Sequence, residues 1–173
     1  MSMPTTSPPT APTLLATAPG DTGALRFTAA DGSWQHATGV TGWTWESGVL
    51  TVTAASTLAG ATVEARITPR ADRYQLDWDV HGGSPKQLGL AYDLSSAGHW
   101  YGHGEAETPQ GGPGVDQPWP LDAGEVDHKA FGTASYNMID PFWYTSKSTG
   151  LRVDTGNVMD VALNKGEDGL GTF

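Results

Sequence analysis

The chain has 173 residues and a mass of 18.2 kDa, the size of one ordinary domain with one hydrophobic core. Its 19 acidic and 9 basic side chains give a formal net charge of -10, which disfavours nucleic acid and anionic membrane surfaces as partners. The absence of cysteine excludes disulfides and thiolate metal sites, and no apolar run approaches the roughly 20 residues of a membrane span.

The first 20 residues are rich in Ser, Thr and Pro and show no periodic apolar pattern. We predict a disordered leader over residues 1–20, followed by one β-sandwich domain over 21–173. The leader has neither the basic segment nor the apolar segment that a secretory signal contains. A cytoplasmic location is therefore the expectation.

Alternation of apolar and polar residues dominates the rest of the chain. The clearest case is 73–81, where apolar residues from Tyr74 to Val80 alternate with polar ones, and 63–67 repeats the pattern just upstream. The short connection between them predicts an antiparallel hairpin. Further strands are predicted at 24–28, 34–38, 42–46, 49–53, 88–94, 142–145, 151–154 and 158–163. Frequent turn signals and the lack of a helical apolar stripe favour an all-β, antiparallel β-sandwich.

One long segment interrupts this rhythm. Residues 106–128 are rich in Gly, Pro and acidic side chains, and we predict that they form a loop. They also contribute to an uneven charge, because 101–173 carry eleven acids and four bases, whereas 1–100 carry eight acids and five bases. Long loops on a rigid scaffold often carry function.

The polar residues near this loop are of types that suit two kinds of chemistry. His99, His103, Glu105 and His128 are of types that bind zinc, but their spacing is not that of a zinc helix, so surface histidines are the simpler interpretation. No metal or other cofactor is expected. The carboxylate pairs Glu105 with Glu107 and Glu125 with Asp127 are candidates for glycoside hydrolysis, against the simpler interpretation of solvated loop carboxylates.

Aromatic residues beside acids and amides suit a sugar, since ring faces stack on C–H groups while carboxylates and amides bind hydroxyls. The candidate substrate-binding residues are Trp100, Glu105, Asp116, Gln117 and Trp119. Trp119 lies between two prolines and is the leading candidate. Burial in the core is the alternative for Trp100 and the expectation for Trp78 and Trp143.

Several of these segments together resemble a known family. Tyr101, Gly102, Gly104 and Glu105 match a Tyr-Gly-x-Gly-Glu turn, and QPWPL follows at 117–121. In a later hairpin the matching residues are Pro141, Phe142, Ser146, Gly150, Val153 and Asp154. Over residues 60–165 the chain resembles the N-terminal β-sandwich of glycoside hydrolase family 31. The run from His99 to Gly102, with Gln117 and Trp119 downstream, is similar to the branch that includes the myogenesis-regulating glycosidase, which acts on α-galactosides.

The resemblance implies a galactose-mutarotase-like supersandwich that continues beyond Phe173 and precedes a (β/α)8 barrel. In the family that barrel carries the catalytic Asp residues of a retaining exo-α-glycosidase, so no catalytic residue is expected in this chain. The domain would pack on the barrel, and segment 106–128 would wall the pocket for an α-galactoside or α-glucoside, with Glu105 at its base. The alternatives are a free-standing carbohydrate-binding module and a small complete jelly-roll glycosidase using Glu105, Glu107 or Glu125.

Overall fold

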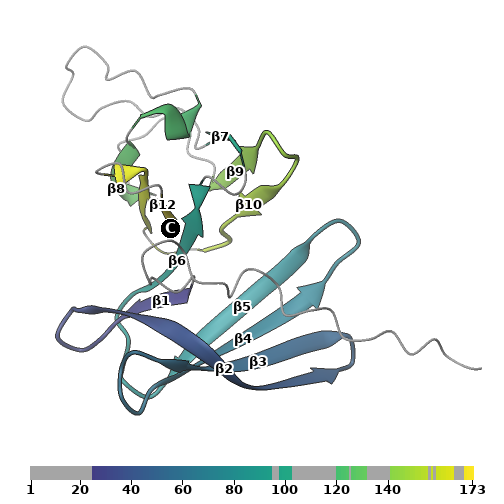
Figure 1. Cartoon of the computed structure of the whole chain (residues 1–173), viewed down its shortest axis with the longest axis vertical. Coiled ribbons are helices and arrows are strands. Elements are labelled where there is room, and N and C mark those ends of the chain that lie inside the picture. The colour runs from purple at the N-terminus through teal and green to yellow at the C-terminus, as the bar shows by residue number, and fades with distance from the viewer. Residues whose placement is uncertain are drawn as a thin grey trace, which may run out of the picture. The chain divides into compact units, whose positions relative to one another are not determined.

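The computed structural model describes residues 25–94, 98–102, 120–124, 126–131, 141–155, 157, 159–165 and 170–173. The chain divides into two compact units, Met1–Gly89 and Leu90–Phe173, which are described separately (Figure 1). The strand pairs in these ranges are antiparallel, and none of the residues described is α-helical. The predicted all-β, antiparallel class is confirmed. Within the same ranges, no helix is long and apolar enough to cross a membrane.

The first unit contains a strongly twisted antiparallel sheet (Figure 1). Its strands are β1 (Leu25–Thr28), β2 (Trp34–Glu46), β3 (Val49–Ser56), β4 (Thr62–Pro69) and β5 (Tyr74–His81), in the order β5-β4-β3-β2-β1. The predicted hairpin is confirmed, because β4 and β5 pair with Val63 opposite Val80 and Pro69 opposite Tyr74.

Strand β2 differs from the prediction of two separate strands at 34–38 and 42–46. It runs for 13 residues, and its register against β3 shifts between Ala37 and Val40 and again between Val40 and Gly42. Gly39 lies between the two predicted strands, and glycine favours turns. Here the irregularities absorb the extra residues, so the strand continues through the glycine.

The register gives this sheet one apolar and one polar face, as period-two alternation requires. Two apolar rows run across β2 to β5: Trp45-Leu50-Ile67-Leu76 and Trp43-Val52-Ala65-Trp78. The intervening positions on the other face include Glu64, Arg66, Asp77 and Asp79. The centres of the apolar rows are buried, whereas the β2 tryptophans are exposed and Trp78 is only partly buried.

The second unit contains two sheets. One has the order β6-β12-β11-β8, and the other has the order β10-β9-β7. The strands are β6 (Leu88–Asp93), which begins in the first unit, β7 (Trp100–Gly102), β8 (Val126–Phe131), β9 (Phe142–Thr145), β10 (Gly150–Arg152), β11 (Met159–Leu163) and β12 (Leu170–Thr172), with a 3-10 turn η3 (Leu121–Ala123).

Side chains from both sheets of the second unit fill one core. Trp143 of β9 and Trp100 of β7 belong to the same buried cluster as Leu163 of β11. The Trp143 and Phe173 rings meet edge to face with centroids 4.6 Å apart. Two sheets that face one core make this unit sandwich-like, as predicted, and the predicted burial of Trp143 is confirmed.

The C-terminal end of the predicted loop at 106–128 differs from the expectation, because η3 lies within it and β8 begins within it. Strand β8 pairs with β11, with Val126 opposite Leu163 and His128 opposite Val161. The Gly- and Pro-rich sequence upstream concealed this long-range pairing. The predicted leader at 1–20 lies outside the described residues, and both the single domain at 21–173 and the supersandwich topology stay predictions.

The difference between a buried and an exposed leucine predicts an unequal cost for two substitutions. Leu163 is 0% exposed and Leu88 is 47% exposed. Leu163→Ala leaves a cavity and should lower the free energy of unfolding by about 2–5 kcal/mol, whereas Leu88→Ala should cost less than about 1 kcal/mol. Urea unfolding followed by near-UV circular dichroism measures both, and equal costs would contradict the assigned core.

Tyr92 supplies a pH-dependent test of the same core. Its ring packs against Trp100 and Phe173, and burial raises its pKa from 10.0 to about 12. Between these values the unfolded chain loses the phenol proton and the folded chain keeps it, so stability falls as pH rises from 10 to 12. Over that range the wild type should lose about 2 kcal/mol more than Tyr92→Phe. Tyr74→Phe, at an exposed tyrosine, should follow the wild type, and parallel curves for wild type and Tyr92→Phe would refute the assignment.

Candidate functional site

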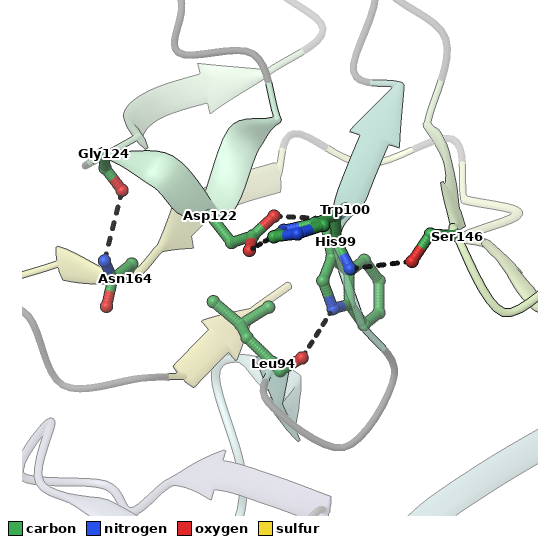
Figure 2. Close-up of polar contacts among 7 residues, drawn as sticks. All are labelled: Leu94, His99, Trp100, Asp122, Gly124, Ser146 and Asn164. Carbon is green, nitrogen blue, oxygen red and sulfur yellow. Dashed lines mark hydrogen bonds and ion pairs between the residues drawn. The ribbon is translucent and has the colours of Figure 1, made fainter.

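The candidate site is the pair of stems on either side of residues 103–119. Strand β7 ends at Gly102 before this segment, and Pro120 follows it. Asp122 joins the two stems: its Oδ1 accepts a hydrogen bond from the Trp100 backbone N–H at 2.7 Å, and its Oδ2 lies 3.1 Å from His99 Nδ1 (Figure 2). We call His99, Trp100 and Asp122 the Asp122 clamp.

Local structure holds Asp122 in this position. It lies in η3, which is closed by a hydrogen bond from the Ala123 N–H to the Pro120 carbonyl at 3.0 Å. Leu121, the preceding residue, is fully buried in the core of the second unit. Because Leu121 anchors the turn in the core, the neighbouring carboxylate is aimed at the backbone of β7.

The His99 stem is tied to the β9–β10 turn as well. The His99 N–H donates to Ser146 Oγ at 3.1 Å (Figure 2). The Ser146 N–H donates to the His99 carbonyl at 2.9 Å. The side chain of His99 is 64% exposed and that of Asp122 is 20% exposed. Solvent screens the imidazole–carboxylate pair, so the less exposed bond to the Trp100 amide contributes more to the clamp.

Trp100 lies in the core in this structure. Its indole N–H donates to the Leu94 carbonyl at 3.2 Å (Figure 2). Its ring packs in the cluster that contains Trp143. Burial gives Trp100 a structural role at the base of the segment. Its predicted contact with a substrate stays a prediction.

The surroundings of Gly102, at the end of β7, explain why the first Gly of the Tyr-Gly-x-Gly-Glu pattern is a glycine. Its φ is +114°, in the range that favours glycine. A Cβ at this position would overlap the backbone oxygen of Phe142 and lie 3.0 Å from Trp143 Cα. Only a residue without a side chain therefore allows β7 to approach β9 this closely.

A second tie supports the stem that follows the segment. Asn164 Nδ2 donates to the Gly124 carbonyl at 3.3 Å, which links the residue after η3 to the end of β11 (Figure 2). Sequence reasoning missed Asp122, Ser146 and Asn164 as positioning residues. Asp122 and Trp100 are 22 residues apart, and no local sequence pattern indicates a hydrogen bond between them.

Four of the five predicted binding residues lie in the segment between the stems. Glu105, Asp116, Gln117 and Trp119 lie outside the described residues, as do Glu107, Glu125 and the side chain of His128. Within the described ranges, no three His, Asp or Glu side chains gather as a metal site would require. Among the candidate zinc ligands, His99 has a described side chain, and its ring lies beside the Asp122 carboxylate.

The clamp predicts a graded response at Asp122. Asp122→Ala leaves the Trp100 amide without its partner and should lower the free energy of unfolding by about 1–3 kcal/mol. Asp122→Asn keeps an oxygen that can accept this bond and should cost less. Asp72→Ala is the matched control, because Asp72 is exposed and pairs with the exposed Arg73. Denaturant unfolding that gives Asp72→Ala and Asp122→Ala the same cost would rule out the clamp.

Comparison with known proteins identifies a family. The family model of the myogenesis-regulating glycosidase N-terminal domain matches residues 13–173, a range that includes both stems and the segment between them. No curated protein and no solved structure matches the chain. Because the family model covers nearly the whole sequence, the chain belongs to the family of the myogenesis-regulating glycosidase N-terminal domain.

Proposed function

We propose that this chain is the non-catalytic N-terminal domain of a retaining exo-α-glycosidase of family 31, and that it packs on a (β/α)8 catalytic barrel and shapes the substrate pocket. The substrate is an α-galactoside or an α-glucoside. Membership in a glycosidase N-terminal domain family supports a carbohydrate substrate and a catalytic domain elsewhere in the parent protein. The Asp122 clamp is the observation that carries the pocket-shaping role.

The clamp matters because a pocket wall must be held in place before substrate arrives. Residues 103–119 comprise 17 residues between two stems that one carboxylate joins. Closing the ends of a segment during folding removes entropy that substrate binding would otherwise have to remove. In this proposal Trp119, which directly precedes Pro120, stacks on the sugar from a fixed attachment point.

The environment of Asp122 supports a positioning role rather than a catalytic one. Glycoside hydrolysis uses two carboxyl groups, one of which donates a proton and one of which acts as nucleophile or base. Both oxygens of Asp122 face protein nitrogens, from the Trp100 amide and the His99 ring. In the proposal the reacting carboxylates come from the barrel.

The isolated chain should not hydrolyse p-nitrophenyl α-galactoside or α-glucoside. In the full-length glycosidase, Trp119→Ala should raise KM about tenfold or more with a smaller change in kcat, because a wall residue acts mainly in binding. Trp34→Ala, at an exposed tryptophan of β2, is the matched control and should leave both constants near wild type.

Two results would count against the proposed function. Turnover by the isolated chain that Glu105→Gln abolishes would favour the small complete glycosidase. Identical kinetics for Trp119→Ala and Trp34→Ala in the full-length enzyme would contradict the assignment of segment 103–119 to the pocket wall.

A further inference from the structure

A row of aromatic rings lies on the outer face of the β10-β9-β7 sheet. Tyr101 stacks on Tyr144 with ring centroids 5.5 Å apart and planes 23° apart, and Phe142 stacks on Tyr144 at 6.1 Å and 27°. We call Tyr101, Phe142 and Tyr144 the aromatic ladder. Trp143, between two ladder residues on β9, points into the core, so the alternation of the strand turns the ladder away from it.

Two of the three rings of the ladder are exposed, and Tyr101 is partly buried. Phe142 is 40% exposed and Tyr144 is 42% exposed. Gly150 of β10 pairs with Tyr144, and a Cβ on Gly150 would lie only 3.1 Å from Phe142 Cε2 and 3.3 Å from Cζ. The glycine therefore leaves room for the Phe142 ring against β10.

Polar groups lie beside the aromatic ladder. Arg152 of β10 pairs with Phe142 and is exposed, and two of the three rings carry phenolic hydroxyls. The surface thus offers apolar ring faces together with hydroxyl and guanidinium hydrogen-bonding groups. A sugar chain has the complementary chemistry, with apolar C–H faces and a rim of hydroxyls.

The size of the ladder argues against a protein occupant. Aromatic side chains present about 150–250 Å² each, so three rings exposed by less than half offer at most roughly 300 Å². A stable protein interface buries about 800 Å² on each partner. A linear oligosaccharide, by contrast, needs only a few rings on which to stack.

We propose that the aromatic ladder is a glycan-binding surface that takes a neutral α-linked oligosaccharide, a role different from the one that the proposed function gives to residues 103–119. The rings stack on successive sugar units, and Arg152 and the tyrosine hydroxyls bind sugar hydroxyls. The proposal rests on the proposed function only for the choice of α-linked sugars. A neutral ligand also suits a chain whose net charge is -10.

Calorimetric titration of the 173-residue chain with maltotetraose and with stachyose tests the proposal. At least one should bind saturably, and Tyr144→Thr should weaken that binding at least fivefold while a threonine keeps the strand preference. Tyr144→Phe keeps the ring and should stay within about threefold of the wild type. Tyr74→Thr, at an exposed tyrosine of β5 in the other unit, should bind like the wild type.

The outcomes separate this proposal from the proposed function. No saturable binding of either sugar, or unchanged binding by Tyr144→Thr, overturns the ladder. Loss of binding in Trp119→Ala but not in Tyr144→Thr would also overturn it and would place the sugar at segment 103–119. If Tyr144→Thr does not fold, NMR of tyrosine-labelled wild type decides: the sugar should shift the ring signals of Tyr101 and Tyr144 but not those of Tyr74.

Discussion

The hydrogen bond from the Trp100 amide to the Asp122 carboxylate joins two parts of the second unit that are distant in sequence. On one side of it, the Trp100 ring fills the core beside Trp143. On the other, Leu121 buries its side chain in the same core and aims Asp122 at the bond. The ends of segment 103–119 are therefore set by core packing, and a change in the core would move the segment's attachment points.

Strands β7 and β9 serve two purposes at once because their side chains alternate. Trp100 and Trp143 face inward and make the core, while Tyr101 and Tyr144 face outward and make the ladder. The same backbone register fixes both sets, since Tyr101 pairs with Tyr144 and Gly102 with Trp143. The clamp and the ladder thus depend on one pairing, which Gly102 permits by lacking a side chain.

The sequence predicted those parts of the fold that local alternation defines, such as the β4–β5 hairpin and the strand at 142–145. It did not predict β7, because three residues are too few to show a period, or β8, which depends on pairing with distant β11. At the site, Trp100 stood out by type, but Asp122 did not, because its role comes from a bond across 22 residues. Composition can indicate where a segment is unusual, but it cannot show which side chain holds the ends of that segment.

Amide hydrogen exchange at Trp100 is the most direct test of the Asp122 clamp. If the carboxylate holds the two stems together, the Trp100 N–H of the wild type exchanges as slowly as the β11 amides that pair with β12, and Asp122→Ala accelerates its exchange selectively. Exchange at Trp100 that is already as fast as in the exposed β9–β10 turn, or that Asp122→Ala leaves unchanged, would contradict the account.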